Sequence, residues 1–74
     1  MDYMVIEIYN REIMRKTKVH GHDAAVKLAN EWLKAEYANA TSLSGHEYAN
    51  SETNCAWLTY ANGKGYDVHV VEVA

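Results

Sequence analysis

Apolar and polar residues alternate in two segments near the N-terminus, and this alternation predicts two β-strands. In residues 3–9 one face carries Met4, Ile6 and Ile8, and the other carries Tyr3, Val5, Glu7 and Tyr9. In residues 13–19 one face carries Ile13, Arg15, Thr17 and Val19, and the other carries Met14, Lys16 and Lys18. Only the ends of the second segment are apolar, and lysines discourage pairing with another sheet. We therefore expect it to be a solvent-exposed edge strand.

A stripe of apolar residues with helical spacing follows Gly21 and predicts an α-helix over residues 23–37. The stripe consists of Ala25, Val26, Leu28, Ala29, Trp32, Leu33 and Ala35, and the opposite side carries Lys27, Asn30, Glu31 and Lys34. Asp23 suits the N-cap, and its charge also suits a position one residue inside the helix. Glu36 projects near the middle of the stripe. We expect that the helix has passed the sheet at this point, the alternative being a carboxylate held against the core.

Residues 38–54 lack a clear period, and we expect a long loop there. Residues 41–45 are rich in turn-forming types, and residues 46–50 are compatible with a short helical turn. Long loops in small domains tend to be functional or mobile. Tyr-Ala-Asn occurs at 37–39, 48–50 and 60–62. Because all three residue types are common in this chain, we attribute the repetition to chance.

A β-hairpin is predicted at the C-terminus, where the runs 55–60 and 66–74 flank the turn pair Asn62-Gly63. A loop of two or four residues places Cys55, Trp57 and Thr59 on the same face as Tyr66, Val68 and Val70, which makes the better core face. A three-residue loop would reverse one of the strands. We expect Trp57 and Trp32 to be core residues. The other face, with Leu58, Tyr60 and Val71, is then a candidate contact surface or is covered by a second copy.

The predicted fold class is α+β, a two-layer single domain over residues 1–74 with one amphipathic helix packed on a small antiparallel sheet. The order of elements is β-β-α-β-β. The strand at 3–9 and the strand at 66–74 are the most apolar, so we expect them to lie side by side at the centre of the sheet.

Size and composition favour a binding role over catalysis. A chain of 74 residues leaves little room for an enclosed substrate pocket, and we expect no enzyme and no cofactor. No apolar run approaches the roughly 18 residues that span a bilayer, and the first residues do not form a signal peptide. A single cysteine excludes an intrachain disulfide, so a reducing compartment and a cytoplasmic location are expected.

Reactive side chains are scattered. Four histidines and Cys55 lack the spacing of a zinc site, so we expect no metal. No serine or cysteine is tied by its spacing to a histidine base, as nucleophilic catalysis requires. Gly63-Lys64-Gly65 lacks the spacing of a phosphate-binding loop and reads as a hairpin turn.

Charge is distributed unevenly over a chain whose net charge is −3. The candidate partner-binding residues are the basic Arg11, Arg15, Lys16 and Lys18 together with the tyrosines Tyr9 and Tyr60. Basic side chains pair with carboxylates or phosphates, and tyrosines often anchor protein interfaces. A partner protein is the first expectation. Sequence-independent binding of nucleic acid through residues 11–18 is the alternative, and a homodimer is also compatible with the sequence.

The segments Ala56-Trp57-Leu58-Thr59-Tyr60 and Gly63-Lys64-Gly65-Tyr66 resemble the C-terminal hairpin of small phage anti-CRISPR proteins of the type I inhibitor class. The resemblance covers a short part of the chain and the coarse order of elements. It implies a stoichiometric inhibitor, encoded by a phage or mobile element, that blocks a nucleic-acid-binding surface of its target. It transfers no individual functional residue.

Overall fold

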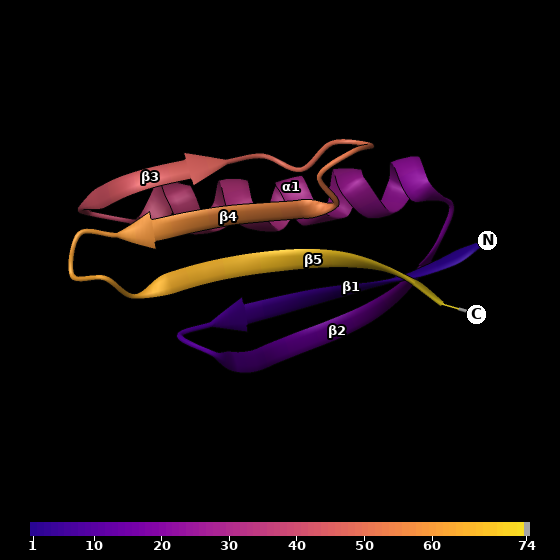
Figure 1. Cartoon of the computed structure of the whole chain (residues 1–74), viewed down its shortest axis with the longest axis horizontal. Coiled ribbons are helices and arrows are strands. Elements are labelled where there is room, and N and C mark those ends of the chain that lie inside the picture. The colour runs from indigo at the N-terminus through magenta and orange to yellow at the C-terminus, as the bar shows by residue number, and fades with distance from the viewer. Residues whose placement is uncertain (74) are drawn as a thin grey trace.

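One α-helix lies across one face of a five-stranded antiparallel sheet in the computed structural model, which describes residues 1–73 (Figure 1). The elements are β1 (Asp2–Tyr9), β2 (Glu12–His20), α1 (His22–Asn39), β3 (Leu43–Glu47), β4 (Cys55–Tyr60) and β5 (Gly65–Val73). The spatial order of the strands is β2-β1-β5-β4-β3. The predicted α+β class is confirmed, as is the central pairing of β1 with β5. Ala74, the last residue of the predicted hairpin, lies outside the described residues.

The first two strands form a hairpin whose turn residues, Asn10 and Arg11, both have positive φ (47° and 72°). Two successive residues of this kind suit a tight turn that matches the twist of the strands. A bulge follows, because Glu7 pairs with Arg15 whereas Ile8 pairs with Ile13. Because Met14 is the extra residue of the bulge, Ile13 projects from the opposite side of the sheet to Arg15. The expectation that Ile13 and Arg15 share one face is therefore wrong. The expected edge position of β2 is confirmed, and all but one of its side chains are exposed.

The helix begins at His22, directly after Gly21, and Asp23 lies in its first turn rather than at the N-cap. A carboxylate in that turn interacts favourably with the helix dipole. Ala25, Ala29 and Leu33 are the buried positions of the helix, whereas Ala35 is exposed. The helix extends to Asn39, two residues beyond the predicted end. No helix within residues 1–73 has the length and apolar character needed to cross a membrane.

Residues 43–47 form the edge strand β3 rather than a loop, and the short helical turn expected at 46–50 is wrong. The strand reads Leu-Ser-Gly-His-Glu, and its ladder with β4 contains a bulge between Leu43 and Gly45. A short, mostly polar edge strand with a bulge lacks the apolar alternation by which strands are recognised. Only pairing with β4 makes this segment a strand.

In the hairpin of β4 and β5, the side chains of β4 that share a face with Tyr66 and Val68 are not the ones expected from the sequence. Tyr60 donates its N–H to the Lys64 carbonyl (2.9 Å), so the loop consists of three residues, 61–63. Gly63, with φ 90°, donates to the Tyr60 carbonyl (2.9 Å) and forms the bulge typical of such loops. An odd loop length places Ala56 beside Val68 and Leu58 beside Tyr66. Trp57 consequently faces away from the helix, and its expected place in the core is wrong.

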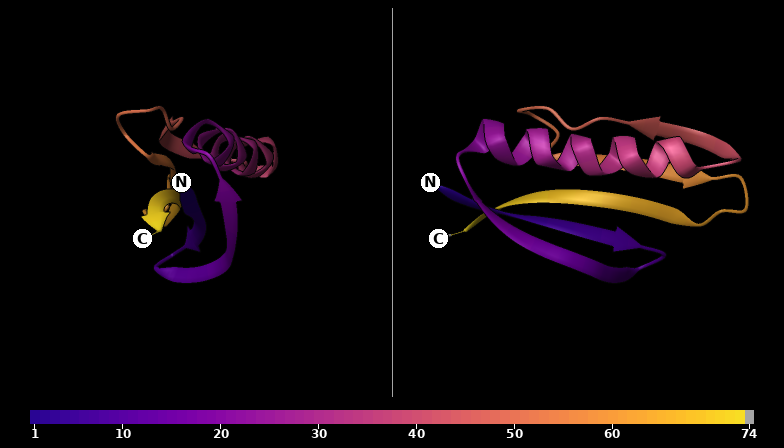
Figure 2. Two further views of the ribbon diagram at one scale, coloured as in Figure 1. Left: turned by 90° about the vertical axis from the view of Figure 1, so that its right-hand side faces the viewer. Right: turned by 180° about the vertical axis from the view of Figure 1, so that it is seen from behind.

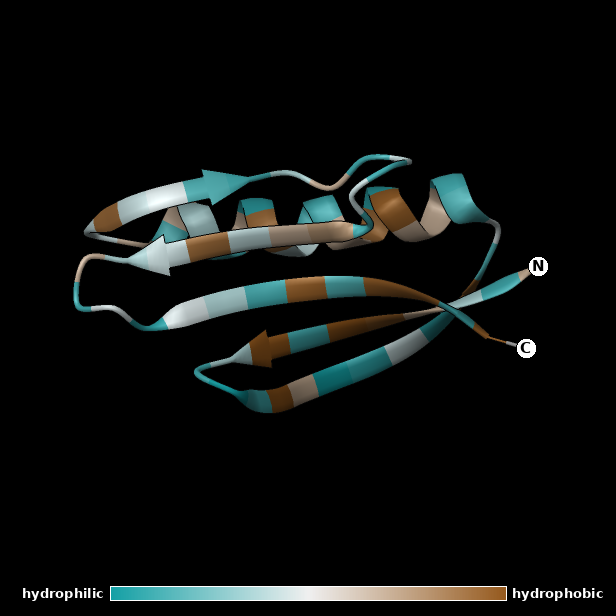
Figure 3. Cartoon of the chain, in the orientation of Figure 1, coloured by the Kyte–Doolittle hydropathy of each residue, from teal (hydrophilic) through white to brown (hydrophobic). Residues whose placement is uncertain are grey.

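The hydrophobic core lies between α1 and the face of the sheet that carries Val5, Leu58, Tyr66 and Val68, all fully or almost fully buried. The strands curl around the helix on this side (Figure 2). The opposite side, which we call the open face, presents Met4, Ile6, Ile8, Ile13, Trp57 and Val71. No element of residues 1–73 covers it (Figures 1 and 2). Brown apolar segments alternate with teal polar ones along the middle of β5, whereas β1 carries a longer continuous brown stretch (Figure 3).

The left-handed conformation of Gly63 allows a direct test of the three-residue loop between β4 and β5. A Gly63→Ala change adds a Cβ that meets no atom within 4 Å, so its effect is purely conformational. A left-handed conformation costs an L-residue about 1 to 2 kcal/mol, and we expect the free energy of unfolding in urea to fall by that amount. Gly65→Ala is the matched control, because its Cβ also meets open space and its φ is not positive. Equal losses in the two variants would contradict the assigned loop.

Candidate functional site

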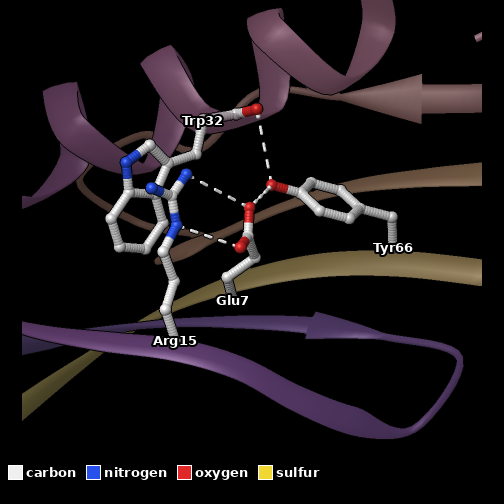
Figure 4. Close-up of polar contacts among 4 residues, drawn as sticks. All are labelled: Glu7, Arg15, Trp32 and Tyr66. Carbon is white, nitrogen blue, oxygen red and sulfur yellow. Dashed lines mark hydrogen bonds and ion pairs between the residues drawn. The ribbon is translucent and has the colours of Figure 1, made fainter. Parts of the chain in front are cut away.

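A partly buried carboxylate organises the helix-facing side of the sheet. Glu7 of β1 retains 14% side-chain exposure and lies between Arg15 of β2, Tyr66 of β5 and Trp32 of α1 (Figure 4). We call these four residues the Glu7 cluster. The Tyr66 hydroxyl donates to Glu7 Oε2, and it also lies 3.4 Å from the Trp32 carbonyl oxygen. Burying a charge is costly unless the charge is paired and hydrogen-bonded, and the cluster meets both conditions.

Arg15 supplies the positive charge of the Glu7 cluster. Its Nε lies 3.0 Å from Glu7 Oε1, and a terminal nitrogen lies 3.4 Å from Oε2. Its guanidinium carbon also lies 3.8 Å from the centre of the Trp32 ring, a cation–π contact. Figure 4 shows the guanidinium between the indole and the carboxylate. Arg15 therefore has its charge engaged within the protein, and Arg15→Glu would set two carboxylates against each other.

A second carboxylate, Glu36, accepts a hydrogen bond from the Tyr60 hydroxyl. The expectation that the helix has passed the sheet at this position is wrong, because α1 continues to Asn39 and Glu36 is half-buried against β4. Tyr60 is in turn packed edge-to-face against Tyr9, with ring centres 6.1 Å apart. A cavity of about 280 Å³ separates the two carboxylates and is lined by Glu7, Tyr9, Met14, Glu36 and Tyr66.

The two tyrosine hydroxyls that bind these carboxylates have raised pKa values. Burial, followed by the hydrogen bond to Glu36, raises the pKa of Tyr60 to about 12. Burial and the hydrogen bond to Glu7 raise the pKa of Tyr66 further. Both phenols are consequently neutral donors at physiological pH and stabilise the adjacent carboxylates. Burial also raises the pKa of the Cys55 thiol, with Asp67 and Glu47 adding to the shift.

The six predicted contact residues do not form one surface. Arg15, Tyr9 and Tyr60 lie on the helix-facing side, where each contacts another residue of the protein. Lys16 and Lys18 lie on the opposite side of the sheet, since they pair with Ile6 and Met4. Lys18 Nζ is 3.6 Å from Asp2 Oδ2, an exposed ion pair. Arg11 occupies the tip of the β1–β2 turn.

An exposed aromatic row is the feature that sequence reasoning missed. Tyr37 of α1 and Tyr48 flank His46 of β3, with ring centres 4.6 Å and 6.0 Å from the imidazole. Tyr37 is 43% exposed and Tyr48 is 41% exposed. The two tyrosines belong to the two Glu-Tyr-Ala-Asn segments at 36–39 and 47–50. Their proximity depends on β3, which the sequence analysis interpreted as a loop.

A groove of about 580 Å³ runs along α1 beside the aromatic row, and we call it the α1 groove. It is lined by His22, Asp23, Val26, Lys27, Asn30, Glu31, Lys34, Tyr48 and Ser51. Its second wall is fixed to the helix by Asn30, whose side-chain amide donates to the Ala49 carbonyl (2.9 Å) and accepts from the Ala49 N–H (2.7 Å). Within residues 1–73 no three His, Cys, Asp or Glu side chains gather as metal ligands.

The raised tyrosine pKa predicts a loss of stability at alkaline pH. An unfolded tyrosine releases its proton near pH 10, whereas folded Tyr60 retains it to about pH 12. Stabilisation by neutral Tyr60 is therefore complete below pH 10 and is lost as the pH rises towards 12. We expect the urea-unfolding free energy of the wild type to fall more steeply from about pH 10 to about pH 12 than that of Tyr60→Phe. Parallel curves for the two proteins would contradict the hydrogen bond to Glu36.

Comparison with known proteins assigns no function to these surfaces. No protein-family model matches the chain, and no curated protein and no solved structure matches it. The resemblance of the C-terminal hairpin to anti-CRISPR proteins stays a prediction. The function must be argued from the geometry of the chain's own residues.

Proposed function

We propose that this protein is a non-enzymatic binding protein that occupies the surface of a partner protein through the aromatic row and the α1 groove. The observation that carries the proposal is the exposure of Tyr37 and Tyr48 beside a groove. The other four tyrosines are buried or half-buried. Tyrosine is among the residues that most often anchor protein interfaces, particularly when it projects beside a hollow.

The exposed rings are held in place before any partner arrives. Tyr37 and Tyr48 each pack against His46, and Asn30 ties the segment that carries Tyr48 to the helix. Side chains that are already ordered lose less conformational entropy on binding. The row therefore supports recognition by a rigid surface rather than by a segment that folds on its target.

The charges of the α1 groove suit a protein better than a nucleic acid. Asp23 and Glu31 line the groove together with Lys27 and Lys34, so neither sign of charge dominates. A phosphate backbone requires a concentration of positive charge. Protein surfaces, in contrast, offer both signs and apolar area around them.

Direct binding of nucleic acid through residues 11–18 remains the second candidate. Arg15 is engaged by Glu7 and Trp32, and Lys18 lies near Asp2. Arg11 and Lys16 lie at different places, one in the turn and the other on the open face. This division reduces the number of phosphates that one strand of nucleic acid could contact together.

The role of an inhibitor follows from the same proposal. A rigid protein that binds beside a functional site blocks it by excluding the natural ligand, without any reaction of its own. The hairpin resemblance favours a phage or mobile-element origin for such an inhibitor. The helix-side placement of Tyr9 and Tyr60 makes their contribution to binding indirect, through the support of α1.

A double change, Tyr37→Ser with Tyr48→Ser, tests the aromatic row. We expect it to leave the fold intact, because both side chains are more than two-fifths exposed. Capture of the partner from nuclease-treated host lysate by immobilised protein should fall about tenfold or more, as for the loss of two interface anchors. Quantitative mass spectrometry of the captured proteins provides the measurement.

The matched control is Tyr37→Phe with Tyr48→Phe, which retains both rings and should keep most of the captured partner. Undiminished capture by the serine variant would exclude the aromatic row as the contact surface. Salt-sensitive binding to bare DNA or RNA, with no captured protein, would favour the nucleic-acid alternative instead.

A further inference from the structure

The loop between β4 and β5 contains the pair Asn62-Gly63, an asparagine followed by a residue without a side chain. Residues 61–64 are all exposed, and the loop lies at the end of the sheet where β4 and β5 meet (Figure 1). No other asparagine of the chain precedes a glycine. The pair therefore has a chemical environment that no other asparagine of this protein shares.

The main-chain nitrogen of Gly63 is a nucleophile within reach of the Asn62 side chain. Glycine has no Cβ to shield this atom, and a Cβ built at this position would meet no atom within 4 Å. The absence of a side chain also lets the main chain rotate towards the conformation that an attack requires. The nitrogen donates its hydrogen to the Tyr60 carbonyl (2.9 Å), and this bond must open first, as bonds of exposed loops do locally.

The carboxamide of Asn62 is held beside the peptide that follows it. Its Oδ1 accepts a hydrogen bond from the Lys64 N–H (3.0 Å), which makes an Asx turn. Such a turn curls the side chain back over the intervening residue, so that Cγ lies towards the Gly63 nitrogen. The Lys64 N–H also stabilises the negative charge that develops on Oδ1 when Cγ is attacked.

We propose that Asn62 is a site of spontaneous deamidation, in which the Gly63 nitrogen displaces ammonia from the side chain. The nitrogen gives up its proton and forms a bond to Cγ. The bond between Cγ and Nδ2 then breaks, and Nδ2 takes up a proton and leaves as ammonia. The product is a cyclic imide, a succinimide. Water adds to either of its carbonyl carbons and opens the ring to aspartate or to isoaspartate, so water is the only co-reactant.

The aspartate product leaves the path of the main chain unchanged. Its carboxylate accepts the same hydrogen bond from the Lys64 N–H, and a charged acceptor forms a stronger bond than an amide does. We therefore expect this product to be at least as stable as the original protein.

The isoaspartate product routes the main chain through Cβ and so adds one atom to the length of the loop. The loop is anchored on both sides, since Ala61 donates to the Ser42 carbonyl (3.2 Å) and the Gly65 carbonyl accepts from Asn10 (2.8 Å). An extra main-chain atom changes the span between these anchors, and at least one of the hydrogen bonds must lengthen or break. Formation of isoaspartate thus makes the stability of the C-terminal hairpin depend on the age of the protein.

The modification is separate from the proposed binding surface. Residues 61–64 contribute no side chain to the aromatic row or to the α1 groove. Deamidation is measured on the free protein, whereas partner capture measures the aromatic row. The failure of either proposal therefore leaves the other standing.

Ageing of the purified full chain at neutral pH tests the site. Peptide mapping by mass spectrometry, with chromatography that separates aspartyl from isoaspartyl peptides, follows each asparagine over several weeks against an unaged sample. Because a glycine leaves its nitrogen open to close approach, we expect Asn62 to convert about tenfold or more faster than any other asparagine. An unconverted Asn62, or conversion that is uniform among the asparagines, would overturn the proposal.

Asn50 is a matched control within the same molecule. It is exposed, and its Oδ1 accepts from the main-chain N–H groups of Glu52 (2.8 Å) and Thr53 (3.0 Å), an Asx turn like that of Asn62. It differs in being followed by a serine. Conversion of Asn50 as fast as that of Asn62 would assign the reaction to exposure alone and overturn the role of the glycine nitrogen.

Two glycine variants test the attacking atom. Gly63→Ala places a methyl group beside the nitrogen and restricts the rotation of the main chain, so the conversion of Asn62 should slow about tenfold. Gly65→Ala changes a glycine of the same hairpin that is not adjacent to Asn62, and it should leave the conversion rate unchanged. Equal rates in these two variants would contradict an attack by the Gly63 nitrogen.

Urea unfolding of the separated products tests the effect on the hairpin. The isoaspartyl form should have a lower urea midpoint than the unaged protein, because its loop is longer by one main-chain atom. The Asn62→Asp variant is the control for charge, and its midpoint should equal or exceed that of the wild type. An isoaspartyl form with the midpoint of Asn62→Asp would overturn the proposed dependence of stability on age.

Discussion

A single helix can cover only one face of a five-stranded sheet, and the remaining features of this protein follow from that constraint. Side chains on each strand alternate between a face that packs against α1 and a face that does not. The core is consequently limited to the helix-facing positions, among them Val5, Leu58 and Val68. The chain is nevertheless apolar on the uncovered face as well.

The Glu7 cluster explains why a basic strand does not become a basic surface. Glu7 occupies a helix-facing position of β1, where a lone carboxylate would be strongly destabilising. Arg15 is its cross-strand partner, and the Tyr66 hydroxyl reaches it from β5. The positive charge of Arg15 offsets the cost of removing the Glu7 carboxylate from water. Glu36 and Tyr60 repeat the arrangement with a neutral donor in place of the arginine. These contacts bind the second half of α1 to the sheet.

The two principal surfaces lie on opposite sides of the sheet and differ in character. The α1 groove and the aromatic row are polar around exposed rings, which is typical of surfaces that bind and release a partner. The open face carries apolar side chains, among them Ile6 and Trp57, interspersed with charged ones such as Lys16 and Asp67.

The sequence by itself determined the α+β class, the helix and the strands with regular alternation. It also indicated the exposed edge position of β2, because lysines along a strand are typical of an edge. The order of the strands, including the pairing of β1 with β5 that their apolar content only suggested, was decided by the tertiary structure. The tertiary structure alone decided which side of β4 is buried, since one residue more or less in the loop before Lys64 reverses every side chain of that strand. It also made residues 43–47 a strand, through pairing with β4, and it brought Tyr37 and Tyr48 to either side of His46. It engaged Arg15 and Glu36 with partners distant in the chain. Such contacts depend on the packing of whole elements, and no local period records them.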